Sequence, residues 1–205
     1  MRIAATLLCG LLAAACQASS PAGEPPTSSP RAPSVADLAP DLAVARAPYD
    51  SVQVDWKQRL DQPYVYVETR GSYTRVGEAL RQAFEALREQ SLQASGPPFA
   101  LYYDDPGRVS ADELRLRACF PLAAPLRPEP PLAFDVLPST TVVYAYVAGP
   151  YPDAPRAYPS LYAFLRKLEW LEDGPVREIY LVDPAAAASW DDLVTEIQIP
   201  ARSGL

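Results

Sequence analysis

Hydrophobic and polar positions recur in the same order in two stretches of the chain. Each stretch opens with a β-branched and aromatic run, at residues 64–67 and 141–147, which is typical of a strand. A Gly-x-Tyr break follows, and apolar residues then recur at helical spacing over 76–88 and 161–169, with charged residues between them. The pattern therefore predicts a strand followed by an amphipathic helix, twice.

Two more strands are predicted after each helix. Gly96-Pro97 and Gly174-Pro175 are expected to end the helices, because glycine and proline are typical of the residues beyond a helix C-terminus. The element order is thus β-α-β-β in each copy, and a proline-rich connector joins the copies at 121–138. The additional strands are predicted at 99–103 and 114–120 in the first copy and at 176–182 and 193–199 in the second.

The two stretches overlay at an offset of 78 residues with eleven identities, among them Tyr102 with Tyr180. After a shared Asp-Pro turn the offset slips by one residue. A repeat of this length that occurs twice indicates a duplicated half-domain. We therefore expect an α+β domain of two β-α-β-β halves, about 63–121 and 139–201, related by a pseudo-two-fold. It should have an antiparallel sheet, two main helices and a central cleft between the halves.

The first residues have the pattern of an export signal. Arg2 precedes an apolar run over residues 3–15, which is too short to span a bilayer as a helix but suits a signal peptide. The run ends in Ala13-Ala14-Ala15-Cys16, which resembles a bacterial lipobox, although Leu is commoner than Ala at position 13. An ordinary Ala-x-Ala cleavage site is the alternative. We favour a signal peptide at 1–15 and a lipid on Cys16, because a cysteine at this place has no other evident role.

A tether is predicted at residues 16–48. This segment is rich in Ser, Ala and Pro and has no apolar period, so we expect it to be disordered. The globular domain is then expected at 49–205. This organisation predicts an exported protein that is lipid-anchored to the cell envelope, faces the periplasm, and touches the membrane only through its N-terminal lipid.

The composition of the chain mainly excludes certain partners and types of site. The formal net charge of −7 and the lack of a basic run argue against nucleic acid as a partner. The sequence has no histidine, so a Ser-His-Asp triad and a histidine metal site are excluded, and we predict no cofactor and no metal. Cys119 lies in a strand-like segment of the predicted domain and is expected to be buried and structural.

Two motifs in the duplicated stretches resemble a known family. Residues 179–184 are Ile-Tyr-Leu-Val-Asp-Pro, followed at 193–200 by Leu-Val-Thr-Glu-Ile-Gln-Ile-Pro, and 101–106 and 113–121 are their counterparts. This order resembles the GyrI-like effector-binding domain, a small-molecule module of many bacterial transcription regulators, over about 63–201. Regulators of that family carry a DNA-binding helix-turn-helix where this chain has a signal peptide and a tether, so a DNA-binding role is not expected.

The resemblance implies a ligand cleft with a glutamate, and Glu196 is the candidate, since it lies in an otherwise apolar strand. The alternative is a half-solvated strand, because Glu196 and Gln198 alternate with isoleucines. Arg117 is the first-half equivalent of Glu196, and it either presents a base to the cleft or pairs with a surface carboxylate. The other ligand-binding candidates are strand tyrosines, which either stack on a flat ligand or fill the sheet: Tyr66, Tyr102, Tyr144, Tyr146 and Tyr180.

Three functions remain open. The one we favour is a non-enzymatic module that binds a small hydrophobic molecule, cationic in one form of the hypothesis, in the cleft. The second is a hydrolase of reactive electrophilic small molecules, which the resemblance implies for some members, with Glu196 as general base and Tyr144 or Tyr180 as acid. The third is an envelope protein-interaction module with no small ligand.

Overall fold

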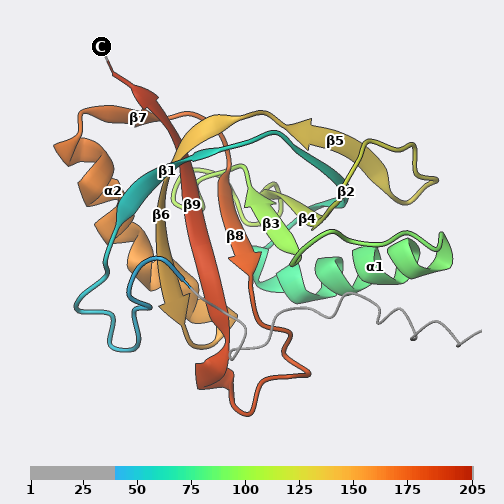
Figure 1. Cartoon of the computed structure of the whole chain (residues 1–205), viewed down its shortest axis with the longest axis horizontal. Helices are drawn as coiled ribbons and strands as arrows, with labels where there is room; N and C mark the ends of the chain where they lie inside the picture. Colours follow the sequence, from blue (N-terminus) through green and yellow to red (C-terminus); the bar gives the residue numbers. More distant parts are fainter. Residues whose placement is uncertain (1–39, 205) are drawn as a thin grey trace, which may run out of the picture.

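The computed structural model of the chain describes residues 40–204 (Figure 1). The predicted signal peptide, Cys16 and the greater part of the predicted tether lie outside the described residues. The helices are α1 (Val76–Glu89) and α2 (Tyr158–Lys167), with short 3-10 helices η2 (Tyr73–Arg75), η3 (Tyr151–Ala157) and η4 (Trp190–Asp192). The strands are β1 (Asp55–Arg59), β2 (Gln62–Arg70), β3 (Phe99–Tyr102), β4 (Arg115–Pro121), β5 (Ala133–Leu137), β6 (Thr140–Ala148), β7 (Trp170–Glu172), β8 (Val176–Tyr180) and β9 (Val194–Ser203).

These strands form one antiparallel sheet in the order β1-β6-β9-β8-β3-β4-β2-β5, with β7 paired to β9. The halves are β2-α1-β3-β4 and β6-α2-β8-β9, and they meet where β3 pairs with β8. In that pair Ala100 lies opposite Glu178, and the same two residues are equivalent under the 78-residue offset. The pseudo-two-fold axis therefore passes through this pair, and the predicted α+β fold of two duplicated halves is confirmed.

The third strands of the two halves, β4 and β9, are related by an offset of 79 residues, one more than the offset of 78 that relates the rest of the halves. Glu68 pairs with Arg117 across β2 and β4, and Tyr146 pairs with Glu196 across β6 and β9. Glu68 and Tyr146 are 78 residues apart, whereas Arg117 and Glu196 are 79 apart. Arg117 and Glu196 consequently occupy equivalent places in the two halves.

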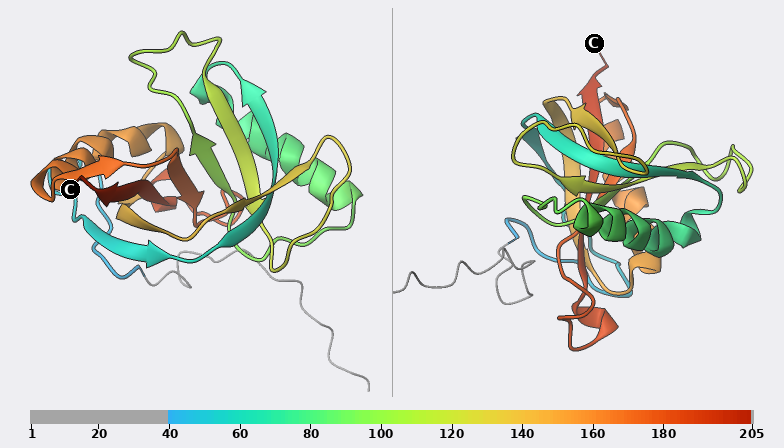
Figure 2. Two further views of the ribbon diagram at one scale, coloured as in Figure 1. Left: turned by 90° about the horizontal axis from the view of Figure 1, so that it is seen from above. Right: turned by 90° about the vertical axis from the view of Figure 1, so that its right-hand side faces the viewer.

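Two short links curl the sheet. Residues 60–61 join β1, at one edge, to β2, which lies next to the other edge, and residues 138–139 join β5 to β6 in the same way. Links this short span only about 10 Å, so the two edges must approach each other. Where the links meet, the backbone N–H of Ser139 donates to a carboxylate oxygen of Asp61 at 2.6 Å. Figure 2 shows the resulting curl from above and from the side.

Both helices lie on the same face of the sheet, which we call the helix-covered face (Figures 1 and 2). Helix α1 packs through Ala79, Ala83 and Ala86, whose small side chains let the helix approach the sheet closely. Helix α2 packs through the larger Leu161 and Leu165. The opposite face, the helix-free face, lies inside the curl, because a pocket on it is lined jointly by β1, β3, β8 and the second link.

Both helices end earlier than the glycine–proline pairs predict, so that prediction is wrong. Ser91 and Glu169, which are equivalent under the offset, take positive φ angles of 55° and 56°. After α1, the N–H of Leu92 donates to the carbonyl of Leu87 and that of Ser91 to the carbonyl of Arg88, the two bonds of a Schellman motif. A left-handed residue other than glycine therefore ends the helix.

Three strands are not predicted by the sequence pattern. Strands β1, β5 and β7 are short, and their exposed or half-buried positions do not give a clear apolar alternation. Strand β5 lies within the proline-rich connector at 121–138, so this segment extends the sheet at its edge as well as joining the halves.

The predicted boundary between tether and domain needs a correction. Ala45 is buried, and its backbone bonds to Tyr146 and Ala148 on β6. Tyr49 is also buried, and its hydroxyl donates to the carbonyl of Ala148 at 2.9 Å. Residues 41–48 thus cover the part of the β6 edge that β1 leaves unpaired. The packed part of the domain begins before residue 49.

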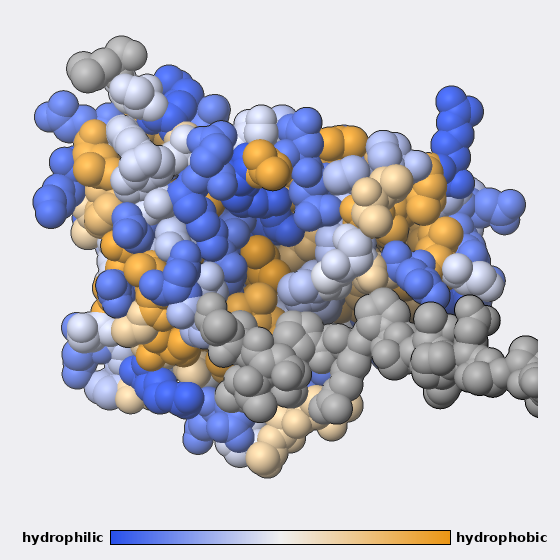
Figure 3. Space-filling view, in the orientation of Figure 1, coloured by the Kyte–Doolittle hydropathy of each residue, from blue (hydrophilic) through white to orange (hydrophobic). Residues whose placement is uncertain are grey.

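Apolar side chains are also found on the surface of residues 40–204. Over residues 40–204 no helix has both the length and the apolar character needed to cross a bilayer. On the side drawn in Figure 3, apolar side chains lie in separate patches among polar ones. The large exposed hydrophobic residues are Trp56, Leu60, Phe84, Val136, Leu171 and Trp190.

Candidate functional site

The helix-covered face carries a buried carboxylate at the centre of the sheet. Glu178 lies on β8, on the pseudo-two-fold axis, and is only 3% exposed. Its first-half equivalent is Ala100, so the duplication places an acid in one half only. Three phenol groups donate to this carboxylate, from Tyr158 at 2.6 Å, Tyr102 at 3.0 Å and Tyr180 at 3.2 Å.

Two further tyrosines stand beside these donors. The Tyr73 ring packs edge-on against Tyr102, with 4.8 Å between ring centroids, and Tyr151 packs against Tyr180 at 4.5 Å. The two ring pairs are equivalent under the 78-residue offset, so they surround the axis symmetrically. We call the whole group the tyrosine cage: Glu178, Tyr73, Tyr102, Tyr151, Tyr158 and Tyr180.

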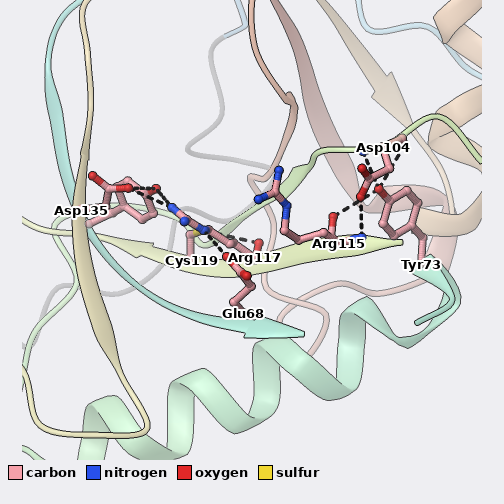
Figure 4. Close-up of polar contacts among 8 residues, drawn as sticks. Glu68, Tyr73, Asp104, Arg115, Arg117, Cys119 and Asp135 are labelled. Carbon is pink, nitrogen blue, oxygen red and sulfur yellow. Dashed lines mark hydrogen bonds and ion pairs between the residues drawn. The ribbon is translucent and has the colours of Figure 1, made fainter. Parts of the chain in front are cut away.

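The duplicated Gly-x-Tyr break places Tyr73 and Tyr151 at the two sides of the cage. In both halves the glycine has a positive φ, +122° or +129°, and the chain turns there from a strand into a 3-10 helix that begins with the tyrosine. Backbone groups then fix both rings. The Tyr73 hydroxyl accepts from the N–H of Asp104 at 2.9 Å (Figure 4), and the Tyr151 hydroxyl donates to the carbonyl of Val182 at 2.8 Å.

The Glu178 carboxyl has no cationic side chain paired with it among residues 40–204. Burial raises the pKa of Glu178, and the phenol hydrogen bonds oppose that rise. Burial also raises the pKa of Tyr102, Tyr158 and Tyr180 well above the usual value, and the nearby Glu178 carboxylate adds to it. A cation would offset the desolvation of this carboxylate and would meet the negative faces of the rings.

Sequence reasoning missed Glu178, although a signal was present. The predicted strand 176–182 is the copy of 99–103, and the offset makes Glu178 the equivalent of Ala100. When two copies of one strand pair antiparallel, an equivalent pair of residues falls on the symmetry axis. Glu178 also lies two residues before Tyr180, and therefore on the same side of the strand.

Glu196 lies on the helix-free face, where a cation of its own chain engages it. The Lys57 ammonium is 2.8 Å from a carboxylate oxygen of Glu196, and the Gln198 side-chain amide donates to the same oxygen. The ammonium also lies 3.9 Å from the centroid of the Tyr144 ring and donates to the Tyr146 hydroxyl at 3.4 Å. The structure thus brings Glu196, Tyr144 and Tyr146 together, but around Lys57.

Arg117 occupies the equivalent place in the first half and is paired with two carboxylates. Its guanidinium bonds to Glu68 at 2.8 Å and to Asp135 at 2.9 Å (Figure 4). The guanidinium also covers the Tyr66 ring, 4.0 Å from the ring centroid. Of the two interpretations of Arg117, the structure shows the pairing with carboxylates. Neighbouring Cys119 is buried, and burial raises the pKa of its thiol, which confirms the expected buried cysteine.

The candidates from the sequence are therefore divided between the two faces. Tyr102 and Tyr180 belong to the tyrosine cage, whereas the remaining five lie across the sheet in two clusters of the helix-free face. A combination of Glu196 with Tyr180 cannot act on one ligand atom, because the sheet lies between them. Within residues 40–204, no cluster of three or more side chains has the makings of a metal site.

Several proteins of known structure share this fold. EcmrR in its complex with DNA superposes with a TM-score of 0.66 and 19% identity, covering 74% of this chain and 58% of that chain. The EcmrR C-terminal domain superposes at 0.64 with 18% identity, covering 74% of this chain and 98% of the domain. The chain thus spans little more than half of EcmrR and nearly all of its C-terminal domain.

Two further structures extend the comparison. SAV2435 bound to tetraphenylphosphonium superposes with a TM-score of 0.54 and 10% identity, covering 73% of this chain and 94% of that one. A hydrolase from Listeria innocua gives 0.57 and 13%, covering 78% and 94%. No curated protein sequence matches the chain. The profile of the GyrI-like small molecule binding domain matches residues 53–202, well over half of the chain. The chain therefore belongs to the GyrI-like small-molecule-binding family.

Proposed function

We propose that this protein is an exported lipoprotein whose GyrI-like domain binds a small hydrophobic cation in the tyrosine cage, with Glu178 as the counter-charge. The proposal gives Glu178 the role that the sequence analysis assigned to Glu196. The observation that carries it is the buried carboxylate of Glu178, which has phenol donors around it and no ion pair with any cation of residues 40–204.

The contrast between the two buried glutamates supports this choice. At Glu196 a cationic ligand would have to displace Lys57 from both the carboxylate and the Tyr144 ring. At Glu178 the ligand would replace only neutral phenol groups. Tyr180 is buried, whereas the other four tyrosines of the cage are half-buried, so a ligand would enter between these half-buried rings. A desolvated cation over an aromatic face gains about 2 kcal/mol, beside its attraction to the carboxylate.

The comparison with SAV2435 supports the choice of probe. Tetraphenylphosphonium is a hydrophobic cation without hydrogen-bond donors, so its binding depends on apolar contact and charge. At 10% identity the two proteins share the fold, and the probe therefore stands for a chemical class and not for the natural ligand.

Glu178→Gln tests the proposal, with Glu196→Gln as the matched control on the opposite face. Tetraphenylphosphonium is titrated calorimetrically into the wild type and both variants at low ionic strength. Because the glutamine has the same shape but no charge, the affinity of Glu178→Gln should be roughly ten- to a hundredfold weaker. Glu196→Gln should bind as the wild type does.

Other outcomes would overturn the assignment. Loss of binding in Glu196→Gln alone would move the site to the helix-free face. If the wild type binds neither tetraphenylphosphonium nor the neutral triphenylphosphine oxide, the small-ligand proposal fails. The protein-interaction alternative would then be favoured, with the exposed Trp56 and Leu171 as its starting point.

A hydrolase is the second candidate, and one contact favours it. The Tyr158 hydroxyl lies 2.6 Å from the Glu178 carboxylate, which suits a phenol acid beside a carboxylate base. The raised pKa of Glu178 makes it a stronger base than an exposed glutamate. Under this alternative Glu178→Gln would still bind an electrophilic substrate but would no longer turn it over, whereas under the binding proposal the wild type has no turnover to lose.

A further inference from the structure

Arg177 carries a buried positive charge on the opposite face from the tyrosine cage. It precedes Glu178 along β8, so the two side chains point to opposite sides of the sheet. Arg177 is 5% exposed, and its Nε and Nη1 atoms have no hydrogen-bond partner within the part of the chain that the structure describes. Arginine stays protonated in proteins, so this charge is buried while its Nε and Nη1 donors are unused.

The guanidinium of Arg177 stacks on one aromatic ring, that of Phe99. Its central carbon lies 3.9 Å from the centroid of the Phe99 ring. Stacking on a ring satisfies the flat face of a guanidinium but leaves the N–H groups at its edge without acceptors. Leaving such donors buried and unpaired is costly, which points to an acceptor that residues 40–204 do not provide.

Arg177 lines a pocket of about 250 Å³ inside the curl of the sheet. Arg59, from β1, lines the same pocket and donates to the side-chain carbonyl of Gln198 at 3.2 Å. Burial lowers the pKa of Arg59, and the Glu196 charge opposes this. Much of the remaining wall is apolar and comes from Leu101, Leu137, Pro138, Val142, Pro175 and Pro200.

The carboxylates near this pocket are already engaged. Asp173 lies on the pocket wall and pairs with Arg202 at 3.7 Å, on an exposed part of the surface. Glu196 pairs with Lys57 at 2.8 Å. Neither carboxylate makes an ion pair with Arg177, so the pocket keeps an excess of positive charge.

We propose that this pocket binds a small apolar acid, a fatty or aromatic monocarboxylate, whose carboxylate is held by Arg177 and Arg59. A carboxylate matches the planar fork of a guanidinium and would pair with Arg177 where its side chain meets the pocket. The apolar wall would hold the body of the ligand. The site is independent of the proposed cation site, because the sheet separates them.

Arg177→Met tests the site, with octanoate as the probe and octan-1-ol as its neutral match. Calorimetric titration should show saturable octanoate binding by the wild type and at least roughly tenfold weaker binding by the variant. Methionine keeps most of the length of arginine but removes the charge. The matched control is Arg117→Met, on the same face, because that arginine is already paired and should not affect octanoate binding.

Several results would overturn the proposal. Among these are no saturable octanoate binding to the wild type at millimolar concentration, equal binding by Arg177→Met, and equal binding of octan-1-ol. Inorganic phosphate binding as tightly as octanoate would indicate a bare oxyanion site in place of an apolar-acid site. If Arg177→Met does not fold, Arg59→Met is used in its place. An octanoate affinity of Arg59→Met equal to that of the wild type would also contradict the proposed site.

A competition experiment tests whether this pocket and the tyrosine cage are separate sites. Tetraphenylphosphonium is titrated into protein saturated with octanoate, and its affinity should equal that of the free protein. Competition between the two would mean one shared site and would contradict the proposal.

Discussion

At the residue scale, the partners of a buried charge say more than its burial. Glu178 and Glu196 are both buried glutamates of neighbouring strands, yet among the described residues only Glu196 has a cationic partner, Lys57. Arg177 is the converse, a buried cation with unused donors. In each unbalanced case the folded chain bears a desolvation cost that a ligand of opposite charge would reduce.

The imbalance at Glu178 predicts a pH dependence of stability. Because the folded-state pKa is raised above the ordinary 4.5, the folded protein binds this proton more tightly than the unfolded chain does. The stabilising contribution is therefore complete below about pH 4.5 and is lost as the pH rises through the folded pKa. Glu178→Gln removes the titration, so its free energy of unfolding should fall less than that of the wild type over this range.

Urea unfolding at several pH values between about 4 and 8 measures the difference. Glu89→Gln, at the exposed end of α1, provides the background for loss of one surface charge. Parallel pH profiles for the wild type and Glu178→Gln would contradict the predicted contribution of this carboxylate.

At the scale of the element, hydrophobic periodicity predicted the strands and helices within each half. It missed the strands that form only because they pair with a neighbouring strand. The strands and helices of the duplicated halves were found because each keeps its apolar period. Strand β1 is Asp-Trp-Lys-Gln-Arg, and only its pairing with β6 makes it a strand. The site was harder for the same reason, since the face to which Glu178 or Glu196 points follows from sheet register and curl. Seven candidate residues were named, and two of them lie in the tyrosine cage.

The duplication provides an internal control for one turn. Gly71 and Gly149 are equivalent and both have positive φ, at 122° and 129°. A Cβ at Gly71 would meet nothing within 4 Å, whereas at Gly149 it would lie 2.6 Å from the Tyr49 hydroxyl. Gly71→Ala should cost about 1–3 kcal/mol from backbone strain alone, and Gly149→Ala should cost more.

The difference between the two free energies of unfolding, measured in urea, reports the packing of Tyr49 on β6. In a Tyr49→Phe background, which removes the contacting hydroxyl, the two alanine variants should become more alike. Equal costs in the wild-type background would show that residues 41–49 do not pack as the structure describes.

At the scale of the whole molecule, one sheet separates two unlike environments. Its helix-covered face centres on an acid among phenols, and its helix-free face holds arginines and a lysine beside aromatic rings. The overall charge of −7 does not reveal this division, since it sums both faces and the surface. Any function is therefore expected to belong to local sites, and under the proposed lipoprotein the N-terminal segment would determine only where those sites are displayed.

If the N-terminal segment anchors the protein and the domain alone binds ligand, the effect of Cys16→Ser can be predicted. With a lipid on Cys16 and a flexible tether, the domain would be held on the order of 30 Å from the membrane surface. The wild type should fractionate with membranes, take up labelled palmitate and be released by detergent, whereas Cys16→Ser should be soluble and unlabelled. Tetraphenylphosphonium affinity should be the same for both, because Cys16 lies far outside the matched domain. A variant that remains membrane-bound, or a wild type that takes up no label, would contradict the lipid anchor without affecting the cation site.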